Sequence, residues 1–161
     1  MKLPEGTKAA LDGQKVTISG PKGSLSMSFH SPDAKIELKE GELEVSGTKE
    51  MANTISAHVM NMALGVTKGY AKKLKILYSH FPISVELKGK EIFIKNFLGE
   101  KQPRKAKIMG QTKVESKGQE VSISGISKDD VGQTIANIKS ATKIRNRDSR
   151  VFQDGFYAVE E

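Results

Sequence analysis

The sequence predicts an α+β protein made of two similar domains in tandem, each an antiparallel sheet packed against one helix. Three observations support this fold class. Short hydrophobic alternations separated by turns occur in both halves of the 161-residue chain, each series leads into a stretch with helical periodicity, and the halves share motifs at a nearly constant offset. Antiparallel strands that bury one face against a helix are a stable layered arrangement.

The first half begins with residues that alternate between hydrophobic and polar, as they do in strands with one buried face. The pattern predicts two hairpins, one joining residues 16–18 to 25–29 through a turn at 20–23, and one joining 36–38 to 43–45 through a turn at 40–41.

The hydrophobic period then changes from that of a strand to that of a helix. Thr48 is expected to open the helix, and Gly65 or Gly69 to close it. Residues 74–78 return to strand alternation. The buried face of the helix is predicted from hydrophobic residues spaced three or four apart, which are Met51, Ile55, Val59, Met62 and Val66.

The second half repeats this order of elements. A strand is predicted to begin at residues 92–94, and residues 101–107 are expected to form a basic turn region. Strands around Val114 and at residues 121–123 are predicted on either side of a Lys117-Gly118 turn. A helix follows a capping-box-like start at Ser127–Asp130, with a buried face predicted from Val131, Ile135 and Ile138.

Two pairs of matching motifs indicate that the second half duplicates the first. Val45–Gly47 corresponds to Ile123–Gly125, and Asn53–Ile55 corresponds to Gln133–Ile135, in the same place relative to strand and helix. We therefore expect domains at residues 1–78 and 79–161. Each copy alone is small for a stable core, so the copies are expected to pack together.

Composition limits the partners that the protein can have. The chain carries 26 Lys+Arg against 19 Asp+Glu, a net charge of +7, which favours polyanions and above all nucleic acid. No stretch approaches the about 18 apolar residues of a spanning helix, so no membrane partner is expected. Because the chain has no cysteine, disulfides, thiol catalysis and cysteine-bound zinc are excluded. An intracellular, soluble protein is expected.

No pattern in the sequence indicates catalysis. The three histidines lack a second ligand at metal-binding spacing, and Asp129 and Asp130 are better explained as charges in the first turn of a helix. The glycine-containing turns do not match a phosphate-binding loop. We expect no enzyme activity, no cofactor, no metal site and no small-molecule substrate.

The arginines are concentrated at one place. All four lie in the second half, and three of them fall in KIRNRDSRVFQDGFY, residues 143–157. The planar guanidinium group suits phosphate oxygens, so an anionic partner of fixed geometry is indicated, although a solvated run of charge remains an alternative. The candidate RNA-binding residues are Arg104, Lys105, Lys139, Lys143, Arg145, Arg147 and Arg150.

The other residues of this stretch are expected to support the arginines. Asp148 and Asp154 are interpreted as internal struts that hold arginine or loop backbone, because bare carboxylates repel phosphate. Phe152 and Tyr157 are expected to anchor the loop in the core, and stacking on an unpaired base is the alternative role.

Several long motifs resemble one known family. They are LPEG at residues 3–6, GPKG at 20–23, NMALGVTKGYAKKLKILYSHFPI at 61–83 and RDSRVFQDGFY at 147–157. Together they are similar to large-subunit ribosomal protein six, called number nine in eukaryotes, in its archaeal and eukaryotic branch.

The resemblance implies a specific function. It implies an RNA-binding structural protein of the cytoplasmic ribosome, seated on large-subunit ribosomal RNA near the sarcin-ricin loop and the stalk base. Neighbouring ribosomal proteins of the stalk base would be further partners, and the second domain would make most of the RNA contact. The competing interpretation from the residues alone is a basic protein-interaction scaffold that docks an acidic partner.

Overall fold

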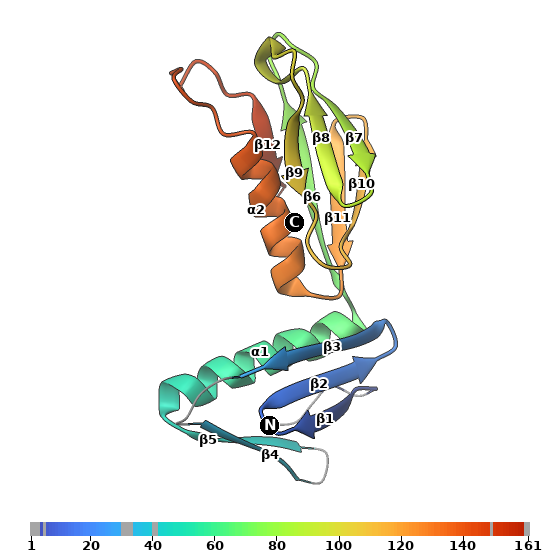
Figure 1. The fold of residues 1–161 in the computed structure, drawn as a ribbon, viewed down its shortest axis with the longest axis vertical. Helices are drawn as coiled ribbons and strands as arrows, with labels where there is room; N and C mark the ends of the chain where they lie inside the picture. Colours follow the sequence, from blue (N-terminus) through green and yellow to red (C-terminus); the bar gives the residue numbers. More distant parts are fainter. Residues whose placement is uncertain (1–3, 5, 30–33, 40–41, 149, 160–161) are drawn as a thin grey trace. The chain divides into compact units, whose positions relative to one another are not determined.

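The computed structural model describes residues 4, 6–29, 34–39, 42–148 and 150–159. The chain forms two compact units. The first comprises Met1–Tyr70 with Ile126–Lys128, and the second Ala71–Gly125 with Asp129–Glu161. No helix in the described ranges is long and apolar enough to cross a membrane. The fold class is α+β, as predicted, with antiparallel sheets and one long helix in each unit (Figure 1).

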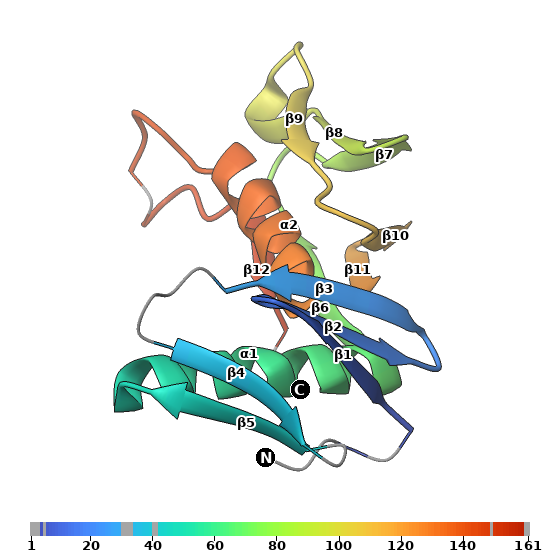
Figure 2. The same cartoon turned by 60° about the horizontal axis from the view of Figure 1, so that its bottom comes forward.

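The first unit combines a three-stranded meander, a hairpin and a helix. The helix α1 packs against β2, β3 and β5, and Figure 2 shows it running beside both sets of strands. All strand pairs are antiparallel. The elements are β1 (Lys8–Asp12), β2 (Lys15–Gly20), β3 (Gly23–Ser28), β4 (Ala34–Lys39), β5 (Glu42–Gly47) and α1 (Lys49–Thr67).

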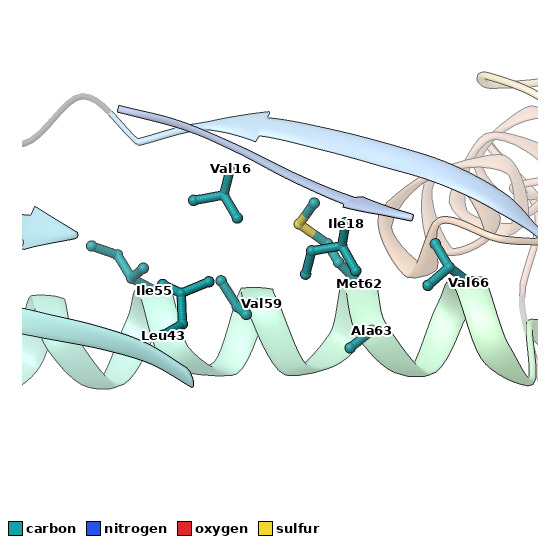
Figure 3. Close-up of a cluster of buried hydrophobic side chains, with 8 residues drawn as sticks. All are labelled: Val16, Ile18, Leu43, Ile55, Val59, Met62, Ala63 and Val66. Atoms are coloured by element: carbon teal, nitrogen blue, oxygen red, sulfur yellow. The ribbon is translucent and has the colours of Figure 1, made fainter. Parts of the chain in front are cut away.

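The core of the first unit lies between α1 and the strands (Figure 3). Val16 and Ile18 alternate along β2 with their side chains fully buried, as a strand with one covered face requires. The predicted buried face of α1 is confirmed at four of its five positions, and Met51 packs at the edge of the cluster. The buried cluster contains Val16, Ile18, Leu43, Ile55, Val59, Met62, Ala63 and Val66.

The predicted ends of α1 are mostly confirmed. Thr48 occupies the N-cap position but makes no side-chain capping hydrogen bond. Gly65 lies inside the helix, where a Cβ atom would come within 2.0 Å of the Ile126 carbonyl oxygen. Gly69 follows the helix with a left-handed φ of 77° and donates its N–H to the Leu64 carbonyl at 3.3 Å. The chain therefore turns out of α1 at Gly69.

The second unit contains two sheets and the helix α2. A four-stranded sheet has the order β10-β11-β6-β12, and a three-stranded sheet has the order β7-β8-β9. The pairs β10–β11, β6–β12, β7–β8 and β8–β9 are antiparallel. The elements are β6 (Tyr70–Leu77), β7 (Ser84–Lys88), β8 (Glu91–Lys95), the 3₁₀ turn η1 (Phe97–Gly99), β9 (Arg104–Lys107), β10 (Lys113–Lys117), β11 (Glu120–Gly125), α2 (Lys128–Ala141) and β12 (Gly155–Ala158).

Some strands differ from the predictions. Residues 101–107 were expected to form a turn region, but Arg104–Lys107 is the strand β9, paired with β8. Only Ala106 of this strand is buried, and its neighbours are basic, so the strand shows no clear alternation of hydrophobic and polar residues. The hydrophobic pattern also did not predict β1, β7 or β12. The hairpins around residues 16–29 and 114–123 are confirmed, whereas the 40–41 turn lies outside the described residues.

The buried face of α2 is rotated slightly from the prediction. Val131 and Ile138 are buried as expected, but Ile135 is only half-buried, and Thr134 takes the fully buried place between them. The Thr134 hydroxyl donates to the Asp130 carbonyl at 2.8 Å and accepts the Met109 N–H at 3.0 Å. Because both hydrogen-bonding capacities are used, a polar side chain is tolerated in the core.

The compact units do not divide the chain where the repeats were expected to meet. The division falls after Tyr70, whereas the sequence suggested residues 1–78 and 79–161. The strand β6 is the reason, because it pairs with β11 and β12 and so joins the sheet of the second unit. The repeat bounds themselves remain a prediction.

We predict that Ile138→Ala destabilises the second unit by about 2–5 kcal/mol, because it leaves a cavity beneath α2. Ile135→Ala is the matched control and should cost less, since Ile135 is half-buried. Urea unfolding followed by circular dichroism measures both free energies of unfolding. Equal losses for the two variants would contradict the observed face of α2.

Candidate nucleic-acid interface

The arginine-rich segment forms a loop between α2 and β12. Figures 1 and 2 both show it projecting from the body of the second unit. Asn146 has a left-handed φ of 58°, a conformation that asparagine tolerates better than most residues. We call residues 143–148 and 150 the arginine loop. It begins where α2 has ended and carries three of the predicted RNA-binding arginines.

Each arginine of this loop is exposed, and two have fixed neighbours. The Arg147 guanidinium lies over the Phe152 ring, 4.9 Å from its centroid. The Arg150 side chain is 89% exposed and forms two hydrogen bonds with Asp148, from Nε at 3.2 Å and from Nη2 at 3.0 Å. Arg145 is exposed to solvent. The loop therefore presents guanidinium groups outward.

Both acidic residues of the stretch serve as the struts predicted for them. Asp148 also accepts the Arg150 backbone N–H at 2.9 Å. Its pKa is lowered, chiefly by the side-chain hydrogen bond from Arg150 and then by this backbone bond. Asp154 is buried, and its carboxylate accepts the Ser79 N–H at 3.1 Å. One carboxylate braces the loop, and the other ties its far end to the segment after β6.

The aromatic anchor of the loop is Phe156 and not Tyr157. Phe156 is 5% exposed and pairs with Ile76 across the β6–β12 ladder. Tyr157, which was expected in the core, is 45% exposed, because successive residues of a strand point to opposite faces. Its hydroxyl still holds the loop by donating to the Gln153 carbonyl at 2.8 Å. Phe152 is half-buried beneath Arg147.

Arg104 has a different environment from the other arginines. Its Nε and Nη2 donate to the two carboxylate oxygens of Glu100 at 2.8 and 2.6 Å. Its Nη1 donates to the carbonyls of Ala141 and Lys143 at 2.9 and 3.2 Å. The guanidinium also lies 4.4 Å from the centroid of the buried Phe97 ring. We call Arg104, Glu100 and Phe97 the arginine clamp.

The arginine clamp joins the basic region at residues 101–107 to the start of the arginine-rich stretch at residues 143–157. The last carbonyls of a helix have no partner within the helix and carry partial negative charge. Arg104 from β9 neutralises this end of α2 and fixes the point where the arginine loop begins. The structure thus brings Arg104 and Lys143 together, although they lie far apart in the sequence.

The clamp shifts the ionisation of both its charged members. The pKa of Glu100 is lowered, mainly by the hydrogen bond from Arg104, with burial opposing and the charges of Arg104 and Arg147 assisting. The pKa of Arg104 is raised by the same hydrogen bond.

The two remaining candidates lie on neighbouring elements. Lys105 is exposed on β9, with its ammonium 5.3 Å from the centroid of the Phe93 ring. Lys139 is exposed in the last turn of α2. The sequence analysis did not identify Glu100 or Phe97 as parts of the site. The four-residue spacing of Glu100 and Arg104 was an available signal, since such pairs often form ion pairs.

Within the residues that the structure describes, no three His, Asp or Glu side chains are grouped so that they could hold a metal ion. The Arg145, Arg147 and Arg150 side chains form a cationic surface on a braced loop. Such a surface is suited to binding an anionic polymer.

Comparison with known proteins identifies the class and then the family. The model of the family described as "Ribosomal protein L6" matches residues 3–69 and 81–155. The chain is therefore a ribosomal protein, which is a structural protein and not an enzyme. It belongs to the ribosomal protein L6 family.

Archaeal relatives match almost the full length of the chain. It is 46% identical to large ribosomal subunit protein uL6 of Methanosarcina mazei, over 100% of this chain and 95% of the relative. The protein of the same name from Methanobrevibacter smithii is 42% identical over 100% and 94%. That of Natronomonas pharaonis is 40% identical over 99% and 94%. The predicted resemblance is confirmed.

We predict that Arg104→Lys lowers stability by about 1–2 kcal/mol, because an ammonium cannot serve a carboxylate and two carbonyls together. Arg150→Lys is the control, since its partner lies on an exposed loop where an ion pair contributes at most about 1 kcal/mol. Thermal unfolding measures both variants. A larger effect at Arg150 than at Arg104 would contradict the clamp.

A second prediction concerns acid. The pKa of Glu100 is lowered in the folded protein. Its carboxylate therefore contributes to stability above its pKa in the unfolded chain, about 4.3, and this contribution is lost as the pH falls through the lower pKa of the folded protein. Glu100→Gln should therefore destabilise the protein at pH 7 and progressively less below about pH 4. Urea unfolding at a series of pH values measures this. In an Arg104→Ala background, the loss of unfolding free energy caused by Glu100→Gln should depend less on pH. A loss that stays constant from pH 7 to pH 3 in the otherwise unchanged protein would contradict the ion pair of Glu100 with Arg104.

Proposed function

We propose that this protein is a structural constituent of the large subunit of the cytoplasmic ribosome and binds large-subunit ribosomal RNA near the sarcin-ricin loop and the stalk base. Membership of the ribosomal protein L6 family and the similarity to large ribosomal subunit proteins uL6 support the assignment to the large subunit. The position on the RNA follows from the family resemblance. Neighbouring ribosomal proteins of the stalk base are proposed as further partners.

The arginine loop is the observation that carries the proposed RNA contact. Ribosomal RNA is largely A-form, and its deep, narrow major groove does not admit side chains, so a protein contacts phosphates, ribose hydroxyls and shape. Exposed guanidinium groups on a projecting loop match a phosphate backbone that has a fixed contour. The net charge of +7 adds long-range attraction for RNA.

The candidate residues have different roles in this proposal. Arg145, Arg147 and Arg150 contact phosphates directly, while Lys105, Lys139 and Lys143 add a less directional field. Arg104 was expected to contact RNA, but its guanidinium is engaged with Glu100 and with two backbone carbonyls. We therefore assign Arg104 the role of a positioning residue that fixes where the loop leaves α2.

The contacts of the loop explain how it can bind without collapsing onto itself. Asp148 holds Arg150 through the backbone N–H as well as the guanidinium, so this side chain keeps a defined direction. Phe152 provides a surface for Arg147, and a ring beneath a guanidinium leaves its edge free for phosphate. The entropy lost on binding is reduced because these side chains are already ordered.

We predict that changing Arg145, Arg147 and Arg150 together to alanine leaves the fold intact and weakens RNA binding. The slope of log affinity against log salt should fall by about two units, at about 0.7–0.9 for each lost phosphate contact. The measurement is filter binding of the full chain to a large-subunit ribosomal RNA transcript of an archaeal relative at several salt concentrations.

The control variant removes the same charge elsewhere. Lys8, Lys15 and Lys35 are exposed lysines of the first unit, and their joint change to alanine should alter the slope much less. If both triple variants lower the slope equally, net charge and not the arginine loop determines binding. An unchanged slope in the arginine variant would reject the proposed contact.

A further inference from the structure

A groove of about 300 Å³ separates the strand β9 from the helix α2 in the second unit. Both ribbon views show these two elements side by side (Figures 1 and 2). The Asn137 amide spans the groove at one point by donating to the Lys107 carbonyl at 2.9 Å. The groove is lined by Lys105, Ala106, Lys107, Asn137, Ser140 and Ala141.

One wall of the groove is the unpaired edge of a strand. In an antiparallel ladder successive residues direct their N–H and C=O groups to opposite edges. Ile108 donates its N–H to Lys90 on the β8 side, so the backbone groups of Lys107 and Lys105 point to the opposite edge. Apart from the carbonyl of Lys107, which Asn137 engages, this edge offers the N–H of both lysines and the Lys105 carbonyl to a ligand.

The opposite wall adds a hydroxyl group. Ser140 lies on α2, and in the described part of the chain its hydroxyl has no hydrogen-bond partner. Ala106 and Ala141 make part of the lining apolar. Lys105 and Lys107 are exposed, so cationic side chains flank a site whose walls are neutral donors and acceptors. This arrangement fits a ligand that is neutral and hydroxylated in the middle and anionic at its ends.

A ribose in an RNA backbone has this chemistry. Its 2′-hydroxyl both donates and accepts a hydrogen bond, and the phosphates on either side are anionic. An extended peptide would also bind a strand edge, but it needs a run of free backbone groups, and Asn137 already engages the Lys107 carbonyl. The volume is at the lower end of small-ligand sites, which suits a single nucleotide unit.

The groove is continuous with the arginine clamp. Ala141 lines the groove, and its carbonyl accepts the hydrogen bond from Arg104 that fixes the end of α2. We propose that the groove binds one ribose-phosphate unit of RNA, with Ser140 and the β9 backbone on the 2′-hydroxyl and Lys105 and Lys107 on the adjacent phosphates. This inference rests on the proposed RNA binding and specifies where the protein distinguishes RNA from DNA.

The experiment is 2′-deoxy interference with the full chain. A large-subunit ribosomal RNA transcript of an archaeal relative is made with sparse 2′-deoxy substitution, bound and unbound fractions are separated, and positions depleted from the bound fraction are mapped. The unmodified protein should show at least one interfering position. With Ser140→Ala that position should stop interfering, and affinity for unsubstituted RNA should fall about three- to tenfold, as for the loss of one hydrogen bond.

The control variant and the outcomes separate this inference from the proposed function. Ser122→Ala removes a hydroxyl from β11, outside the groove, and should leave the interference pattern unchanged. If the protein binds the transcript but Ser140→Ala keeps every interfering position, the groove assignment is wrong and RNA binding stands. If the unmodified protein does not bind the transcript at all, the proposed RNA binding is wrong, and the groove assignment that rests on it falls as well.

Discussion

The arginine loop depends on one interaction, the hydrogen bonding of Arg104 to backbone carbonyls at the end of α2 and just after it. Its guanidinium donates to the Ala141 and Lys143 carbonyls while Glu100 fixes it from the other side. A helix end with unpaired carbonyls frays easily, and a loop that starts from a fraying end has no fixed direction. Because Arg104 lies on β9, the sheet and the helix together determine where the exposed arginines are presented.

The strands that the sequence analysis missed share a physical property. The strands β1, β7, β9 and β12 are all at the edges of their sheets. An edge strand is short and often carries lysine or glycine, so its hydrophobic alternation is weak. Strands with two fully buried residues, such as Val16 and Ile18 on β2 or Val121 and Ile123 on β11, were predicted because burial enforces the alternation. Both helices were predicted for the same reason.

The candidate site was predictable by residue type and only partly by role. Clustering of arginine pointed to residues 145, 147 and 150, and all three are exposed. The inward orientation of Arg104 could not be predicted, because two of its acceptors come from α2 and the segment after it, far along the chain. Tyr157 was expected in the core, but Phe156 takes that place, since a shift of one residue along a strand reverses which side chain is buried.

The two units end their helices in different ways, and the difference explains why a loop projects after α2 and not after α1. After α1, Gly69 ends the helix, and β6 begins at the next residue. After α2, Arg104 of β9 donates to the Ala141 and Lys143 carbonyls, so the chain is not required to turn at once. Residues 143–148 and 150–153 can then leave the body before β12 begins. Capping by a distant side chain in place of a local glycine thus allows a duplicated framework to present an arginine loop.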